Sequence, residues 1–160
     1  MQRITDNSDP ENDSLIFSAV RFGPEHIPAA AELEKICFSD PWSESSLRYL
    51  CESDVTYGVA VVCGDRLCAY GGMEYVLDEA AVTNIATAPE FRRRGCARLV
   101  LSSLESFAVS HGVKRIRLDV RESNVPARNL YTDCGYAVSG RIRGYYRRPR
   151  EDAVEMEKTL

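Results

Sequence analysis

The stretch EFRRRGCARLVL, residues 90–101, combines residue types that suit an anionic ligand. Three consecutive arginines precede Gly95, two small residues follow it, and an apolar segment begins at Leu99. If a helix begins here, its first backbone N–H groups lack intrahelical partners and its dipole is positive at the same end. Such an entrance binds phosphate, and a glycine with small neighbours lets a pyrophosphate approach the backbone closely. The stretch therefore predicts a phosphate-binding turn; the alternative is a solvated first turn of arginines, which would oppose the helix dipole.

The pattern differs from the common nucleotide-binding signatures. It contains no GxGxxG, and neither Gly-Lys-Ser nor Gly-Lys-Thr follows the glycine. The pattern present is R-x-x-G-x-A, from Arg92 to Ala97. Neither a dinucleotide fold nor a P-loop is therefore indicated.

Composition bounds the class of protein that carries this turn. A chain of 160 residues is long enough for one domain with a real core and too short for two ordinary ones. Its 44% hydrophobic and 28% charged residues are typical of a soluble globular domain. Residues 1–14 are polar, with neither the apolar core of a signal peptide nor any periodicity. We expect a cytoplasmic protein with a disordered extension over 1–14 and one domain over 15–160.

Charge is distributed unevenly along the chain. The formal net charge is −4, which argues against a general nucleic-acid binder. Residues 1–54 hold 11 acids and 4 bases, whereas residues 55–160 hold 13 acids and 16 bases. An anionic ligand is therefore expected in the second part of the chain.

The six cysteines occur singly, with no CxxC pair and no Cys/His ligand spacing. Most of them have apolar neighbours in the sequence. We interpret them as reduced, mostly buried side chains and expect no metal site.

Hydrophobic periodicity and turn residues predict the elements that position the turn. Strands are expected over 15–22, 56–63, 66–77, 79–87, 113–120, 136–143 and 153–160, and helices over 24–37, 43–53, 94–111 and 123–135. Residues 144–152, GYYRRPRED, are expected to be an arginine-rich loop. This order predicts an α+β domain with a mixed, mostly antiparallel central sheet of about six to seven strands and about four helices.

The R-x-x-G-x-A turn and the element order resemble the GNAT superfamily of acetyl-CoA-dependent N-acetyltransferases. Within it, the chain is most similar to the bacterial ribosomal-protein-alanine N-acetyltransferases and their archaeal and eukaryotic relatives. The resemblance runs from about residue 15 to the end and rests on DPWSE (40–44), VLDEA (76–80), NIATAP (84–89), RRRGCAR (92–98), LDVRESN (118–124), NLYTDCGY (129–136), YY (145–146) and REDAVEM (150–156). It implies the GNAT fold, with acetyl-CoA as cosubstrate and no metal.

The resemblance also implies a set of residues that hold acetyl-CoA. The backbone of Ile85, Ala86 and Thr87 would pair with the pantetheine arm, as a strand edge pairs with an extended peptide. Asn124 would contact the cosubstrate near the following helix, an assignment compatible with a plain N-cap. The pyrophosphate would be held by Arg93, Arg94, Gly95, Cys96, Ala97 and Arg98.

Two residues stand where the family has its proton-transfer groups. Tyr131 is at the position of the general acid, although its helical spacing also fits a core residue. Asp119 stands where bacterial relatives usually carry a glutamate as base. Aspartate is one methylene shorter, so a bridging water would be needed to restore the reach. The alternatives are that Asp119 pairs with Arg117 or Arg121 and that Glu122 or Glu79 is the base.

The resemblance implies an acceptor site entered between two loops and formed by Pro41, Trp42, Glu79, Tyr145 and Tyr146. We expect acetyl transfer by direct attack to the α-amino group of a protein N-terminus, the N-terminal alanine of a ribosomal protein first of all. The alternatives are a small amine or lysine as acceptor, or a catalytically idle module that binds RNA or the ribosome through the run RIRGYYRRPR. We expect a monomer, with no membrane or nucleic-acid partner.

Overall fold

The computed structural model describes residues 1–6 and 15–160, which form eight strands and four α-helices. The strands are β1 (Arg3–Asp6), β2 (Leu15–Arg21), β3 (Thr56–Cys63), β4 (Arg66–Val76), β5 (Glu79–Thr87), β6 (Arg115–Arg121), β7 (Ala137–Arg147) and β8 (Arg150–Thr159). The helices are α1 (Ile27–Cys37), α2 (Glu44–Glu52), α3 (Cys96–Ser110) and α4 (Val125–Asp133), with short 3-10 turns η1 (Pro24–His26) and η2 (Pro89–Phe91). The predicted α+β architecture with a mixed, mostly antiparallel sheet and four helices is confirmed, with one strand more than the upper expectation.

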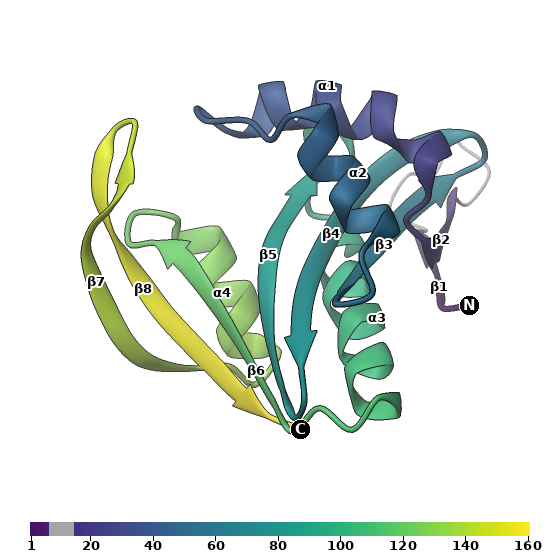
Figure 1. Cartoon of the computed structure of the whole chain (residues 1–160). Helices are drawn as coiled ribbons and strands as arrows, with labels where there is room; N and C mark the ends of the chain where they lie inside the picture. The colour runs from purple at the N-terminus through teal and green to yellow at the C-terminus, as the bar shows by residue number, and fades with distance from the viewer. Residues whose placement is uncertain (7–14) are drawn as a thin grey trace.

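The eight strands form one sheet in the order β1-β2-β3-β4-β5-β6-β8-β7. Every neighbouring pair is antiparallel except β5 and β6, which are parallel. That parallel pairing covers only Glu79–Ala81 opposite Arg115–Arg117. Beyond it, β5 and β6 diverge as Figure 1 shows, and this divergence divides the sheet into two parts.

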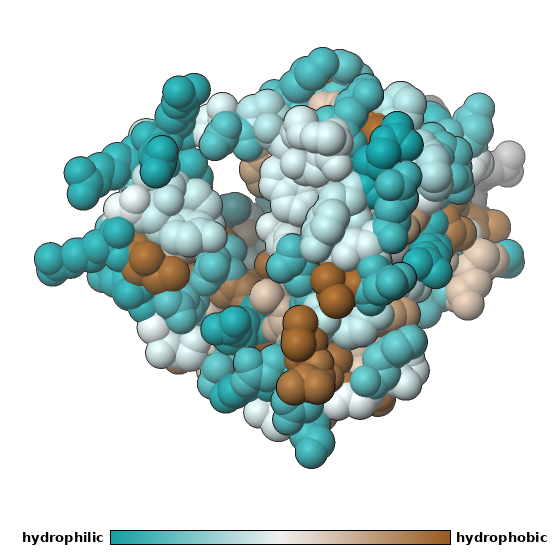
Figure 2. Space-filling model, viewed as in Figure 1, coloured by the Kyte–Doolittle hydropathy of each residue, from teal (hydrophilic) through white to brown (hydrophobic). Residues whose placement is uncertain are grey.

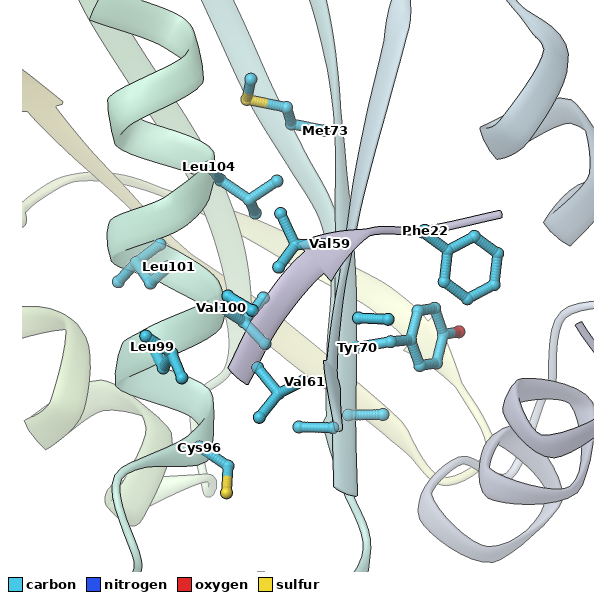
Figure 3. Close-up of a cluster of buried hydrophobic side chains, with 14 of the residues drawn as sticks. Phe22, Val59, Val61, Tyr70, Met73, Cys96, Leu99, Val100, Leu101 and Leu104 are labelled. Atoms are coloured by element: carbon cyan, nitrogen blue, oxygen red, sulfur yellow. The ribbon is translucent and has the colours of Figure 1, made fainter. Parts of the chain in front are cut away.

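Helices cover both faces of the larger part of the sheet. Figure 3 shows Val59 and Val61 pointing toward α3, whereas Phe22 and Tyr70 lie on the opposite side of the strands. These side chains belong to one continuous buried core. On the far side of the divergence, α4 lies beside β6, β7 and β8 (Figure 1).

Two adjacent glycines in β4 let the helices approach the sheet closely. A Cβ atom on Gly71 would lie 2.6 Å from Cγ1 of Val100 in α3, and one on Gly72 would lie 2.5 Å from Cδ1 of Leu50 in α2. Because successive strand residues face opposite sides, these two glycines serve opposite faces. Any larger residue at Gly71 would displace α3 and with it the entrance of that helix.

The expectation of a disordered extension over residues 1–14 is wrong for residues 3–6. They form β1 and pair with β2, with Arg3 opposite Ser18 and Asp6 opposite Leu15. A four-residue strand carries too few side chains to show a period, and its partner makes it a strand. Residues 7–14 lie outside the described part of the chain.

The expected arginine-rich loop is largely strand. β7 continues to Arg147, β8 begins at Arg150, and Tyr146 pairs with Glu151 across the hairpin. The turn is therefore only Arg148 and Pro149. The segment lacks an apolar period because both faces of this tip are largely exposed, so backbone pairing rather than core burial forms it.

All six cysteines are free thiols, with Cys68 and Cys96 buried and the others partly buried. Among the described residues, no helix has the length and apolar character that crossing a bilayer requires.

The packing of α3 against the sheet can be tested at Leu104, which is fully buried. Leu104→Ala should lower the free energy of unfolding by about 2–5 kcal/mol, because it removes buried methyl groups and leaves a cavity. Val109, on the same helix and 59% exposed, is the matched control. Val109→Ala should change the free energy of unfolding by about 0.5 kcal/mol or less. Urea denaturation of the three proteins measures both values, and equal losses would contradict this packing.

Candidate active site

The candidate site begins where β5 loses its partner on one side. β5 pairs with β4 along its whole length, from Val76 opposite Glu79 to Ala69 opposite Thr87. Its pairing with β6 ends at Ala81. From Val82 to Thr87, the second edge of β5 therefore has no strand partner among the described residues. Backbone groups on such an edge are available to an extended ligand.

A bulge lies at the start of this unpaired edge. Gly72 pairs with Asn84 and Met73 pairs with Val82, so Thr83 is an extra residue on β5. Such a bulge increases local twist and bends the strand that carries it. Figure 2 shows the surface hollowed at this place, between the lobe that carries α4, β7 and β8 and the rest of the molecule.

The R-x-x-G-x-A turn lies between η2 and α3. Gly95 has φ 85° and ψ 8°, a left-handed conformation that glycine adopts without steric cost, and α3 begins at Cys96. The first backbone bond of the helix runs from Leu99 N to Gly95 O at 3.0 Å. The N–H groups of Cys96, Ala97 and Arg98 therefore point out of the helix entrance without a cap, as an anion site requires.

Several arginine side chains of this turn already have partners. Arg94 forms an ion pair of 3.1 Å with Asp6 of β1, and Arg92 donates from Nε to the Thr87 carbonyl at 3.4 Å. Arg98 donates to Cys134 Sγ at 3.4 Å. The donors left at this entrance are mainly backbone amides, and Arg94 is held by β1.

Asp119 lies on β6 directly opposite Glu155 of β8. Partial burial, followed by the Glu155 carboxylate, raises the pKa of Asp119 above its usual value, and Arg117 opposes the shift. Within the described chain, Asp119 forms no salt bridge with Arg117 or Arg121, and Arg121 instead pairs with Glu151 at 3.7 Å. Arg117 still interacts with Asp119 electrostatically, so both the role as base and the alternative of a charge partner on this strand stay predictions.

Tyr146 links Asp119 to Tyr131, the other predicted proton-transfer residue. Tyr131 of α4 is 9% exposed, and burial raises its pKa to about 12. Burial, followed by the Asp119 carboxylate, raises the pKa of Tyr146 to about 12, and Tyr131 adds to this shift. Tyr146 therefore interacts electrostatically with both Asp119 and Tyr131. Both phenols stay protonated at neutral pH, so either one can donate a proton.

The two substitute bases are engaged elsewhere. Glu122 is ion-paired with Arg141. Glu79 is ion-paired with Arg115, whose hydrogen bond and charge lower the pKa of Glu79. Glu79 opens β5, whereas Ile85 is six residues further on, or about 20 Å along an extended strand. The structure therefore does not bring Glu79 to the rest of the predicted site.

Asn124 has a structural task in the described chain. Its Oδ1 accepts a hydrogen bond of 3.3 Å from Ala127 N, which caps α4. The N-cap interpretation is thus confirmed, and the contact with acetyl-CoA stays a prediction.

The two segments expected to flank the acceptor meet in the structure. Pro41 and Trp42 lie between α1 and α2, and Ser39 in the same segment donates a hydrogen bond to the carbonyl of Arg148 in the β7–β8 turn. In Figure 1, this segment extends toward the tip of the hairpin. Tyr145 is 51% exposed beside Tyr146, with ring centroids 5.0 Å apart.

One residue of this region escaped the sequence analysis. Glu34 of α1 is almost completely buried, and its Oε2 accepts a hydrogen bond of 3.0 Å from Trp42 N. In the sequence it is one member of an apolar helical face. A carboxylate at a buried position of an amphipathic helix was the available signal.

A separate groove lies away from these residues. It has a volume of about 520 Å³ and is lined by β2, β3 and α3, including Arg21, Tyr57 and Phe107. None of the predicted site residues lines it, and the two aromatic rings are stacked with centroids 3.6 Å apart. The chemistry is therefore assigned to the divergence of β5 and β6.

A parallel strand pair that separates beside an uncapped helix entrance can accept an extended ligand that carries phosphate groups. The model of the acetyltransferase (GNAT) family matches residues 27–136. The chain belongs to this family, whose members use acetyl-CoA.

Similar proteins narrow the class further. A ribosomal protein bS18-alanine N-acetyltransferase from Salmonella typhimurium is 35% identical over 138 residues, which cover 81% of this chain and 88% of that protein. The crystal structure of the ribosomal-protein-S18-alanine N-acetyltransferase from Escherichia coli has a TM-score of 0.83 at 29% identity and covers 90% of this chain and 94% of that one. The crystal structure of Arabidopsis thaliana NAA60 in complex with acetyl-CoA has a TM-score of 0.83 at 13% identity. The match covers 90% of this chain and 98% of that one and shows a shared fold.

The role of the left-handed turn can be tested by calorimetric titration with acetyl-CoA. Gly95→Val should raise the Kd at least about tenfold, because valine resists φ 85° and the exposed amides would shift. Arg92→Ala should change the Kd by only about twofold, since backbone amides provide most of the binding.

Gly112 provides the matched control for backbone strain. It has φ 77° at the other end of α3, with open space where a Cβ would lie. Gly112→Val should therefore lower stability and leave the Kd unchanged. Normal binding by Gly95→Val, or equal weakening by both valine variants, would contradict the proposed turn.

Proposed function

We propose that this chain transfers the acetyl group of acetyl-CoA to the α-amino group of the N-terminal alanine of a ribosomal protein. The observation that carries the proposal is the Salmonella relative, which is 35% identical over 81% of this chain and is named for this reaction. The meeting of the Pro41–Trp42 segment with the β7–β8 hairpin supports it, since the two together could hold a peptide end.

Acetyl-CoA would bind across the divergence of β5 and β6. The unpaired edge of Ile85, Ala86 and Thr87 suits the amide groups of the pantetheine arm. The free N–H groups of Cys96, Ala97 and Arg98 suit the pyrophosphate. Arg93 forms no ion pair in the described chain, so its guanidinium is available to the same phosphates.

The proposed reaction is a direct attack in a ternary complex. The free amine attacks the thioester carbonyl carbon, the new C–N bond forms, and the C–S bond breaks. Asp119, through a bridging water, accepts the proton that the amine loses. Tyr131 donates its proton to the departing sulfur, which leaves the thiol of coenzyme A and an acetylated N-terminus.

The ionisation of the two groups fits these tasks. Asp119 must be charged to accept a proton, so activity that depends on it falls as the pH drops through its raised pKa. Tyr131 must be protonated to donate, and its pKa of about 12 keeps it so. An α-amino group has a pKa of about 8, so part of it is already the free amine at neutral pH. The reaction therefore needs little help from a base.

Because ribosomal proteins are made in the cytoplasm, we propose that the reaction takes place there. The monomeric state and the absence of a membrane partner stay predictions.

The proton transfers can be tested by steady-state kinetics. Tyr131→Phe should lower kcat by about 100-fold with little change in the KM of acetyl-CoA, because it removes a general acid. Tyr136→Phe is the matched control: Tyr136 is also buried, its hydroxyl bonds to Glu105 at 3.1 Å, and its loss should leave kcat within about twofold.

Asp119→Asn should lower the rate at pH 7 by about 10-fold to 100-fold, and raising the pH to 9 should recover part of it as the amine itself deprotonates. Full activity of Asp119→Asn at pH 7 would transfer the role of base to another carboxylate or to bulk water.

The acceptor can be tested with two peptides and mass spectrometry. The first has a free alanine N-terminus and no lysine, and the second has a blocked N-terminus and an internal lysine. The first should be acetylated at least about 100-fold faster at pH 7, because the pKa of lysine is ~2.5 units higher and far less of it is the free amine. Equal acetylation of both, or preference for spermidine, would favour the lysine or small-amine alternatives.

A further inference from the structure

A single carboxylate joins three elements of the site. Glu34 in α1 is only 1% exposed, and it accepts hydrogen bonds from three donors. Oε1 accepts from the Tyr70 hydroxyl and from Asn84 Nδ2, the latter at 3.0 Å. Oε2 accepts from the backbone N–H of Trp42 at 3.0 Å. No cation of the described chain forms an ion pair with it.

The chemistry of this cluster requires a carboxylate. An ionised carboxylate is an acceptor only, with room for three donors on two oxygens, whereas a glutamine would present one acceptor oxygen and an NH₂ group. Burial, followed by the hydrogen bond to Glu34, raises the pKa of Tyr70 well above its usual range, so its hydroxyl stays a donor. An isolated buried carboxylate is unfavourable, and the three donors offset this cost.

The donors come from both halves of the proposed site. Trp42 belongs to the acceptor segment between α1 and α2. Asn84 directly precedes Ile85 on the unpaired edge of β5 and follows the bulge at Thr83. Tyr70 is the strand partner of Ala86 on the same edge. One carboxylate therefore connects the acceptor segment to the strand proposed to hold the thioester.

We propose that Glu34 is a positioning residue that fixes the acceptor segment against β5 and so sets the affinity for the acceptor. Attack on the thioester requires the amine to reach the carbonyl carbon with an error well below 1 Å. The segment is also held by the packing of the partly buried Trp42 side chain against the core and by the exposed hydrogen bond from Ser39 to the β7–β8 turn. The identity of the acceptor rests on the proposed function, whereas the contact with Trp42 does not.

The test is Glu34→Gln, with kinetics for each substrate. We expect the KM of the alanine peptide to rise at least about tenfold and kcat to fall, because the one acceptor oxygen of glutamine cannot serve both Trp42 and the donors Tyr70 and Asn84. The Kd of acetyl-CoA should stay within about twofold, since the backbone of β5 and the entrance of α3 are unchanged. An equal rise in the peptide KM and in the Kd of acetyl-CoA, or no change in either constant, would overturn the proposal.

Two variants separate positioning from general stability. Glu32→Gln alters an exposed acid of the same helix, which pairs with Lys35 at 2.9 Å. This variant should leave the peptide KM and the Kd of acetyl-CoA unchanged. Tyr70→Phe removes one donor from Oε1 and keeps the Trp42 bond, so the peptide KM should change by about threefold or less. A larger rise in the peptide KM for Tyr70→Phe than for Glu34→Gln would contradict a role that acts through the Trp42 hydrogen bond.

A measurement on the unaltered protein covers the case in which Glu34→Gln does not fold. The Trp42 amide should exchange its hydrogen at least about 100-fold more slowly than the neighbouring exposed amides, because it is bonded to a buried acceptor. Exchange at the exposed rate would overturn the proposal. If the wild type acetylates no N-terminal peptide, the proposed function fails, and this exchange rate still decides the role of Glu34.

Discussion

The structure depends on the early end of the pairing between β5 and β6. Three residues of β5 pair with three of β6, and the strands then diverge. β6 has its second ladder with β8 along its whole length, and β5 has its second ladder with β4, so each strand stays anchored after they part. The divergence exposes backbone groups that a continuous sheet would use. The proposed binding of cosubstrate and acceptor at this place depends on the sheet being incomplete there.

The electrostatics of the site come from placement more than from an excess of charge. At the entrance of α3, backbone amides remain available while Arg94 is held by Asp6. Across the divergence, partial burial and then the Glu155 carboxylate raise the pKa of Asp119, and burial keeps Tyr131 protonated. A carboxylate that accepts protons more readily and a phenol that keeps its own are thus held on neighbouring elements. This combination suits an amine that is nearly nucleophilic by itself.

The cluster around Glu34 shows how the acceptor side is tied to this arrangement. An apolar residue in its place could pack well in the core, but it would leave the Trp42 N–H, the Tyr70 hydroxyl and the Asn84 amide without their acceptor. The buried carboxylate therefore ties the position of the Trp42 segment to that of β4 and β5.

By itself, the sequence determined the features that depend on neighbours along the chain. Apolar spacing predicted α1 and α3, the alternation of Ile116, Leu118 and Val120 predicted β6, and Gly95 marked a turn that needs a left-handed residue. These patterns are local because helix and strand periods repeat within a few residues.

Tertiary structure alone decided the features that depend on residues far apart in the chain. β1 exists because β2 pairs with it, and the tip of the β7–β8 hairpin exists because two polar segments pair with each other. Arg94 forms an ion pair with Asp6, Asp119 lies opposite Glu155 across two strands, and Glu34 accepts a hydrogen bond from Trp42 N. Glu79 lies at the far end of β5 from the candidate site. A carboxylate has no period and no preferred partner in the sequence, so only the folded chain brings it to the donors and charges that define its role.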